Sequence, residues 1–170
     1  NVLAELNKTD LGLINKVWRN KCLHWKKNLP TYNYDLKKRD PVDLYFFADK
    51  LSKTIPKKSV FISDSGLIEL ILPTNLKFKK NQRCIHPTSQ GSMGFALPAI
   101  LGAFYASNLP IIAVIGDGSI MMNLQELETI RYHKIPVKIF IINNNAYAII
   151  RKRQNDLFRK RTIGVDHSDG

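Results

Sequence analysis

Two short polar segments of the chain carry side chains suited to binding a hard cation. Residues 116–119 read Gly-Asp-Gly-Ser, and residues 143–145 are three asparagines. Mg²⁺ in proteins takes oxygen ligands, usually one or two carboxylates together with neutral oxygens and phosphate oxygens. Asp117 offers the carboxylate, Asn144 an amide oxygen, and the backbone carbonyl of Ala146 a third ligand. The pattern predicts a divalent-metal site.

The residues around Asp117 favour a bound phosphate as well as a metal. Gly116 and Gly118 have no Cβ, so the backbone can approach a ligand closely, and Ser119 adds a hydroxyl. A helix is expected soon after this segment, and the N–H groups at a helix start attract anions. Taken singly, a Gly-Asp-Gly turn or a strand followed by asparagines is more often structural. Together they predict a clamp for a metal and a diphosphate.

Apolar runs alternate with helical patterns and predict the elements that position these segments. Three runs read as buried strands: 60–62, 110–115 and 136–142. Residues 93–107 show helical spacing, and Asn123 is expected to cap a further helix with Glu126 as its reciprocal partner. The predicted fold class is α/β, a doubly wound parallel sheet with helices on both faces, incomplete at the C-terminus. Ligands of such sheets bind at the carboxyl ends of the strands, where both polar segments lie.

The amino-terminal part has a different pattern from the strand-containing part. Residues 1–30 read as helical, and the polar residues 31–40 read as a linker. Asp40 is expected to cap a second helix, with Pro41 in its first turn and its end near Ile55. The chain does not begin with Met, and neither end carries a terminating feature. We expect both ends to lie within a longer polypeptide.

Composition narrows the class of protein. The 170 residues are 44% hydrophobic and 24% charged, as in globular proteins, and the formal net charge is +12. Such a charge suits nucleic acid or a membrane surface, but the lysines and arginines form only short clusters without interleaved aromatic residues. We therefore expect neither partner and assign the charge to solvated faces. Two distant cysteines, no run long enough to span a membrane and no signal peptide indicate the cytoplasm.

Three further segments extend the pattern around the two polar loops. They are residues 91–103 (GSMGFALPAILGA), 122–130 (MNLQELETI) and 135–138 (IPVK). With Gly-Asp-Gly-Ser and Asn144, they resemble the thiamine-diphosphate enzymes of the acetolactate synthase and related decarboxylase branch. The similarity runs over residues 40–165.

This resemblance implies a role for each matched position. The Mg²⁺ ligands would be Asp117, Asn144 and the carbonyl of Ala146. The other contacts to thiamine diphosphate would come from eight residues: Gly91, Ser92, Met93, Gly116, Gly118, Ser119, Ala148 and Ile149. Met93 would be the wedge that bends the cofactor so that its 4′-amino group reaches C2, although a methionine by its type alone reads as a core residue.

The resemblance also implies an activity and a domain plan. Residues 1–35 would be the tail of a preceding middle domain with its linker, and residues 36–170 a truncated thiamine-diphosphate-binding domain. The enzyme, a transferase or lyase, would decarboxylate a 2-oxo acid, with pyruvate the first candidate, and transfer the acyl-anion equivalent to a carbonyl acceptor. It would act as a homodimer or homotetramer, and FAD in the middle domain is left open. The glutamate that activates the cofactor would come from an amino-terminal domain that no segment here matches, so we expect this stretch alone to be inactive.

Two departures leave the reaction open. Leu67 and Ile68 follow Gly66 where acetolactate synthases carry Gln-His, and Arg153 stands where they carry tryptophan. A simple 2-oxo acid decarboxylase is therefore an alternative to the carboligase. An inactive homologue retained for assembly and a basic nucleic-acid-binding module are alternatives of other classes.

Overall fold

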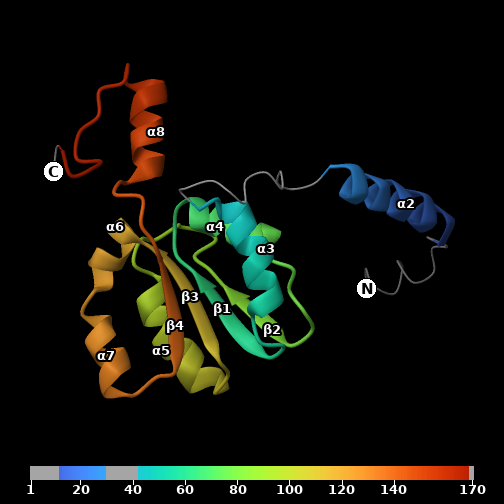
Figure 1. The fold of residues 1–170 in the computed structure, drawn as a ribbon, viewed down its shortest axis with the longest axis horizontal. Helices are drawn as coiled ribbons and strands as arrows, with labels where there is room; N and C mark the ends of the chain where they lie inside the picture. Colours follow the sequence, from blue (N-terminus) through green and yellow to red (C-terminus); the bar gives the residue numbers. More distant parts are fainter. Residues whose placement is uncertain (1–11, 30–41, 169–170) are drawn as a thin grey trace, which may run out of the picture. The chain divides into compact units, whose positions relative to one another are not determined.

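Residues 12–29 and 42–168 are described by the structure, which is a computed structural model (Figure 1). The chain divides into two compact units, residues 1–38 and 39–170. In the first unit, helix α2 spans Gly12–Asn28. The predicted linker and the predicted capping pair Asp40 and Pro41 lie outside the described residues. The assignment of residues 1–35 to a middle domain stays a prediction.

Four parallel strands form the sheet of the second unit, in the order β2-β1-β3-β4. Their bounds are Ser59–Ser63 (β1), Gln82–Ile85 (β2), Ile111–Gly116 (β3) and Val137–Ile142 (β4). The three predicted strands are confirmed to within one residue at each end. The predicted burial of β4 is wrong, because this strand lies at the edge of the described sheet and its residues are half-buried or exposed. The strand β2 was not predicted, because its sequence Gln-Arg-Cys-Ile is no apolar run and its residues are only partly buried.

Helices cover both faces of this sheet, as predicted for a doubly wound α/β fold (Figure 1). One face carries α3 (Leu44–Thr54) and α4 (Leu67–Asn75), and the other carries α5 (Ala96–Ser107) and α7 (Glu126–Tyr132). Three further segments begin after the carboxyl ends of β3 and β4: α6 (Asp117–Ile120), the 3-10 helix η2 (Met121–Asn123) and α8 (Ala148–Leu157). Among the described residues, no helix has the length and apolarity needed to cross a bilayer.

The strands contribute to two separate hydrophobic cores. Val60 and Ile62 pack with α5 on one face, whereas Phe61 packs with α3 and α4 on the other. Successive side chains of a strand point to opposite faces, so a continuous apolar run fills both cores at once. Every residue of β1 and the first five residues of β3 are buried, which makes these two strands the rigid centre of the fold.

Three predicted helix starts are wrong. Asp43, not Asp40, caps α3, and its carboxylate accepts hydrogen bonds from the backbone N–H groups of Tyr45 (2.9 Å) and Phe46 (3.0 Å). Asn123 does not cap α7, which begins at Glu126 without a side-chain cap. The helical pattern seen from residue 93 also begins later, at Ala96. The side chain of Asn123 instead makes a long-range contact described below.

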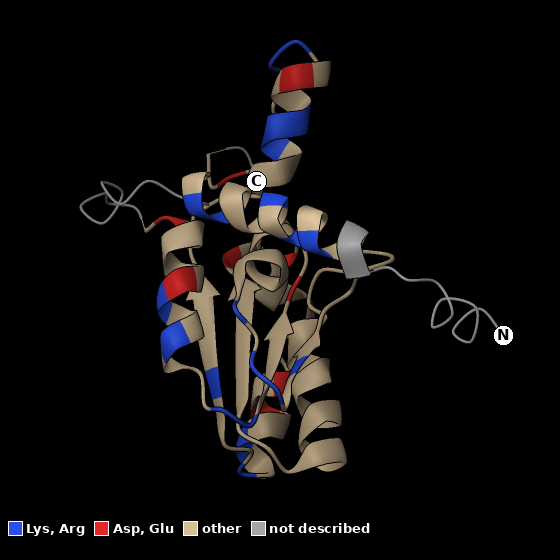
Figure 2. Ribbon diagram, turned by 90° about the vertical axis from the view of Figure 1, so that its right-hand side faces the viewer, with Lys and Arg blue, Asp and Glu red and all other residues tan. Residues whose placement is uncertain are grey.

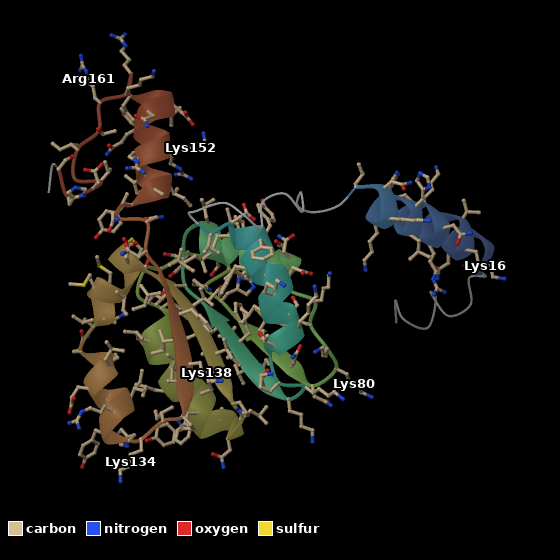
Figure 3. The ribbon with its side chains drawn as sticks, viewed as in Figure 1. Lys16, Lys80, Lys134, Lys138, Lys152 and Arg161 are labelled. Carbon is tan, nitrogen blue, oxygen red and sulfur yellow. The ribbon has the colours of Figure 1, made fainter. Side chains whose placement is uncertain are left out.

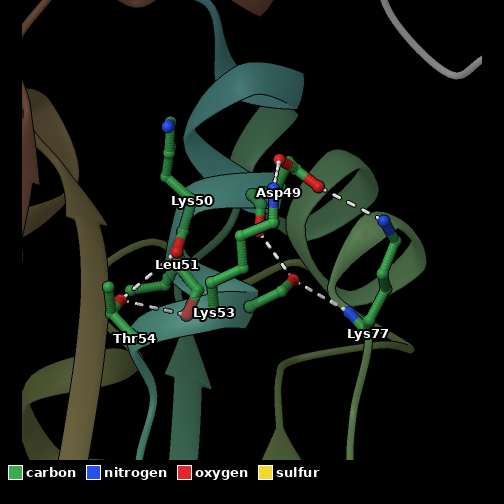
Figure 4. A network of polar contacts seen from close by, with 8 residues as sticks. Asp49, Lys50, Leu51, Lys53, Thr54 and Lys77 are labelled. Atoms are coloured by element: carbon green, nitrogen blue, oxygen red, sulfur yellow. Dashed lines mark hydrogen bonds and ion pairs between the residues drawn. The ribbon is translucent and has the colours of Figure 1, made fainter.

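A buried carboxylate joins α3 to the segment that leaves α4 (Figure 4). Asp49 is 7% exposed, and its two oxygens accept from Lys53 Nζ (2.6 Å) and Lys77 Nζ (3.2 Å). The hydroxyl of Ser52, one turn along α3, accepts from the backbone N–H of Lys77 (3.0 Å). Lys77 is thus held to α3 through both its side chain and its backbone.

We expect Asp49→Asn to lower the free energy of unfolding by about 1–2 kcal/mol, because the substitution removes a buried charged acceptor. The loss is no larger because both lysine partners are largely exposed to solvent. Urea denaturation followed by circular dichroism would measure the change. Asp156→Asn is the matched control, because Asp156 pairs with Lys152 at 2.6 Å on the exposed face of α8. Its expected effect is within about 0.5 kcal/mol of zero. Equal losses in the two variants would contradict the role given to Asp49.

The two cysteines differ in reactivity. Burial raises the pKa of the Cys84 thiol to about 11, whereas Cys22 is exposed on α2. The thiolate is the reactive form, so iodoacetamide at pH 8 should modify Cys22 well before Cys84, as peptide mass mapping would show. Since folding favours the protonated Cys84, its contribution to stability is complete below the unfolded pKa of about 8.5 and is lost as the pH rises towards 11. Faster labelling of Cys84 would contradict its burial.

The positive charge is distributed over many elements (Figure 2). Lys80, Lys134 and Lys152 belong to separate parts of the second unit (Figure 3). Some cations are paired locally, as Lys152 is with Asp156 and Arg131 is with Glu128. The described lysines and arginines therefore do not gather on one element.

Candidate metal and diphosphate site

The segments that follow β3 and β4 begin side by side. The two strands pair in parallel along their whole length, and their last residues, Gly116 and Ile142, are register partners. Asp117 follows the first of these residues, and the asparagine segment follows the second. Asp117 is half-buried and Asn144 is exposed. The strand adjacency on which the predicted metal site depends is present.

The sheet order also places the loop after β1 at this edge. The chain runs from β1 outward to β2 and then returns to the other side of β1 to form β3. Such a reversal opens a crevice between the carboxyl ends of the two central strands, where ligands of α/β sheets bind. The hydroxyls of Ser65, after β1, and Ser119, after β3, are 3.5 Å apart, and both residues are buried. Ser119 is therefore already in contact with the β1 loop.

The loop carrying Asn144 is held by residues further along the chain. Asn144 Oδ1 accepts from the N–H of Ala146 (3.1 Å), and the N–H of Tyr147 donates to the carbonyl of Val165 (2.8 Å). Ala146 also forms an antiparallel bridge with Asp166. These bonds fix the backbone at Ala146, whose carbonyl is the predicted third ligand.

The carboxylate of Asp166 is held in place as well. Hydrogen bonds from Ser168 lower the pKa of Asp166, with a smaller contribution from the Arg151 guanidinium at 3.4 Å. Arg151 lies in the first turn of α8, so this ion pair joins the start of that helix to the returning segment. The returning segment 165–168 thus supports the loop that leads into α8.

Gly118 is in close contact with a side chain from the neighbouring loop. A Cβ placed on Gly118 would collide with the ring of Tyr147, reaching 2.9 Å from Cδ1. The packing of Tyr147 therefore requires glycine here, independently of any ligand. This contact also joins the Gly-Asp-Gly-Ser segment to the start of α8.

Gly116, by contrast, has room for a side chain. A Cβ there would lie 3.8 Å from Ile68 Cδ1 and 4.0 Å from Ser119 Oγ, which are ordinary contacts, and its φ of −77° suits any residue. We expect Gly116→Ala to leave the midpoint of urea denaturation unchanged but to weaken thiamine diphosphate binding, because the methyl group would face the predicted diphosphate. Calorimetric titration of both proteins tests this expectation. Unchanged affinity would show that Gly116 does not contact the cofactor.

The segment containing Gly91, Ser92 and Met93 is a loop that leads into α5. Gly91 and Gly94 have φ values of +59° and +80°, which favour glycine. Met93 is 36% exposed and belongs to neither core, so the structure gives it no core-filling role. A Cβ on Gly94 would lie 3.3 Å from the carbonyl oxygen of Ser119. This loop therefore lies directly against the Gly-Asp-Gly-Ser segment.

The predicted residues thus fall on three adjoining segments at one edge of the sheet. Ala148 and Ile149 form the first turn of α8 beside them. Sequence reasoning missed the residues that hold these segments together: Asp64, Asn123 and Tyr147. Their contacts are made with residues far away in the sequence, so local spacing gives no signal for them.

Comparison with known proteins identifies the family. Residues 64–170 match the family described as thiamine pyrophosphate enzyme, C-terminal TPP binding domain. The chain belongs to the thiamine pyrophosphate enzyme family. The match begins at Asp64 and includes every predicted ligand of the metal and the cofactor.

Individual members of the thiamine pyrophosphate enzyme family are similar over much of the chain. The acetolactate synthase large subunit of Buchnera aphidicola subsp. Schlechtendalia chinensis is 33% identical over 147 residues, 86% of this chain and 25% of that protein. The sulfoacetaldehyde acetyltransferase of Alcaligenes xylosoxydans xylosoxydans is 32% identical over 67% of this chain and 19% of its own length. The chain spans about a quarter of the length of the acetolactate synthases it matches.

A solved structure of the same family has a similar fold. The thiamine diphosphate-dependent 4-hydroxybenzoylformate decarboxylase of Rhodococcus jostii RHA1 matches with a TM-score of 0.65 and 28% identity. The match covers 76% of this chain and 24% of that one. The α/β fold of this chain is thus consistent with its membership of the thiamine pyrophosphate enzyme family.

Proposed function

We propose that this chain holds Mg²⁺ and the diphosphate of thiamine diphosphate in an enzyme that decarboxylates a 2-oxo acid and transfers the resulting acyl-anion equivalent to a carbonyl acceptor. The observation that carries the proposal is the pairing of Gly116 with Ile142, which starts the Asp117 and Asn144 segments from adjacent strand ends. The similarity to acetolactate synthases supports the reaction type.

The residues present are chemically suited to this cofactor. Asp117 would supply the negative charge and Asn144 the neutral oxygen that Mg²⁺ prefers, and the Ala146 carbonyl would add a third protein ligand. Asn144 Oδ1 accepts one backbone hydrogen bond, and an amide oxygen has a second lone pair. A Cβ on Gly116 would make only ordinary contacts, with Ile68 Cδ1 and Ser119 Oγ, so no protein atom crowds this backbone position.

The role of the protein would be to position and bind. Bound thiamine diphosphate supplies the carbanion chemistry that removes CO₂ from the 2-oxo acid. Asp117 and Asn144 would fix the metal, Gly116, Gly118 and Ser119 would contact the diphosphate, and Met93 would set the bend of the cofactor. Ser92, Ala148 and Ile149 would complete its contacts.

Calorimetric titration of the intact polypeptide tests the proposed cofactor. We expect thiamine diphosphate to bind in the presence of Mg²⁺ and to lose its affinity when EDTA removes the metal. Binding that is equally strong in EDTA would contradict the metal clamp, and absence of binding under both conditions would contradict the proposed function.

A simple decarboxylase is a second candidate because two features differ from acetolactate synthases. Ile68 is buried, with Cδ1 3.8 Å from the Cβ position of Gly116, so this side of the proposed diphosphate site is apolar. Arg153 is exposed on α8 where those enzymes carry tryptophan. The structural relative from Rhodococcus jostii RHA1 is a decarboxylase. With pyruvate as substrate, a carboligation product supports the first function and released acetaldehyde supports the second.

A further inference from the structure

Asp64 is a fully buried carboxylate at the carboxyl end of β1. It follows β1 directly, is 0% exposed, and its N–H donates to the carbonyl of Val114 in β3 (3.0 Å). A buried carboxylate is normally paired with a cation or saturated with hydrogen bonds. Within the described residues, the hydrogen bonds to the Asp64 side chain all come from backbone N–H groups.

The partners of the Asp64 side chain lie on two segments, the loop after β1 and the segment that leads into α5. Its Oδ1 accepts from the N–H of Ser65 (2.9 Å) and from the N–H of Gly94 (3.0 Å), which is 30 residues away. Its Oδ2 accepts from the N–H of Ala96 (2.7 Å), the first residue of α5. One side chain therefore attaches the loop that precedes α5 to the end of the most buried strand.

Gly94 is held from its other side as well. Its carbonyl accepts from Asn123 Nδ2 (3.0 Å), and a Cβ on Gly94 would lie 2.7 Å from Met122 Cβ. The backbone immediately after Met93 is thus fixed in position and direction, whereas the Met93 side chain itself is partly exposed. A side chain that acts on a ligand must be held by a fixed backbone, and the backbone next to Met93 meets this need.

We infer that Asp64 is a positioning residue that holds the backbone at Gly94 so that Met93 stays aimed at the thiamine part of the cofactor. This inference rests on the proposed function, because Met93 acts only if the cofactor binds at this edge. Asp64 would touch neither the metal nor the diphosphate, so its effect should be confined to the thiamine moiety.

Asparagine cannot replace Asp64 in this network. The carboxylate accepts on both oxygens, but asparagine has one accepting oxygen and one donating NH₂ group. In Asp64→Asn the NH₂ group would have to face either the N–H of Ala96 or those of Ser65 and Gly94. At least one bond would become a donor–donor contact, and the loop would be released from the strand.

Calorimetry with two probes separates positioning from a general structural effect. In the intact polypeptide with Mg²⁺, Asp64→Asn should weaken thiamine diphosphate binding by about tenfold or more, because the released loop must be ordered again when the cofactor binds. Inorganic pyrophosphate, which lacks the thiamine part, should bind both proteins within about twofold of each other. The matched control is Asp49→Asn, which alters a buried carboxylate of α3 and should leave both affinities unchanged.

Equal loss of both probes in Asp64→Asn, or no loss of either, would overturn the inference. Wild-type protein that binds neither probe would instead overturn the proposed function, and this inference with it. If Asp64→Asn fails to fold, Asn123→Ala tests the same point, because it removes the part-buried second hold on Gly94. That variant should show the same selective loss of thiamine diphosphate, and equal affinities would overturn the inference.

Discussion

Alanine in place of Asp117 is expected to abolish the Mg²⁺-dependent binding of thiamine diphosphate. Asp117 supplies the only charge among the proposed protein ligands. Loss of groups that merely support metal ligands already lowers metal affinity by 10–100-fold, so we expect a decrease of about 100-fold or more for the ligand itself. Titration of the intact polypeptide with thiamine diphosphate at saturating Mg²⁺ measures the change.

The folded state should tolerate this change, because Asp117 is half-buried and begins a short helix rather than filling a core. We expect the urea midpoint of Asp117→Ala to match the wild type, so that lost binding reports the site and not the fold. Asp156→Ala removes an exposed carboxylate of α8 and should bind the cofactor normally. Normal binding by Asp117→Ala would refute the proposed metal ligand.

Alanine in place of Gly94 is expected to cause a large loss of stability. The φ of +80° disfavours a side chain, and a Cβ would lie 2.7 Å from Met122 Cβ and 2.9 Å from Asn123 Nδ2. Backbone strain of roughly 1–2 kcal/mol and overpacking of about 1–3 kcal/mol should together remove several kcal/mol. Urea denaturation gives the stability, and calorimetry should show weaker cofactor binding.

Gly102→Ala is the control for this variant. Gly102 lies inside α5, and a Cβ there meets nothing within 4 Å. Since alanine favours a helix interior over glycine by about 1 kcal/mol, this variant should be unchanged or more stable. A Gly94→Ala protein as stable as Gly102→Ala would show that the loop before α5 is not packed as described.

The sequence predicted the parts of the fold that depend on local pattern. Continuous apolar runs identified β1 and β3, as expected for strands buried on both faces, and also β4, whose residues are half-buried or exposed. The half-exposed β2 escaped notice, and so did α4, whose exposed Leu67 and Leu70 break the usual division into an apolar and a polar face. Pattern reasoning therefore identified the strands that have a continuous apolar run and missed the elements that lack a regular apolar pattern.

The candidate site shows the same division. Asp117 and Asn144 could be assigned because each directly follows a recognisable strand and their chemistry suggests a cation. Asn123 was misassigned as a cap because its real partner, the Gly94 carbonyl, is 29 residues away. Asp64 was overlooked because its partners Gly94 and Ala96 are 30 and 32 residues away. Contacts of this kind arise from the folded topology and leave no mark in local spacing.

The most direct test of the metal clamp is to locate the ion itself. Crystals of the intact polypeptide grown with thiamine diphosphate and Mn²⁺ in place of Mg²⁺ would reveal the metal through its anomalous scattering. We predict one ion about 2.1 Å from a carboxylate oxygen of Asp117 and from Asn144 Oδ1, in contact with the diphosphate. A diphosphate-bound ion held by other side chains, with Asp117 and Asn144 out of its reach, would contradict the account.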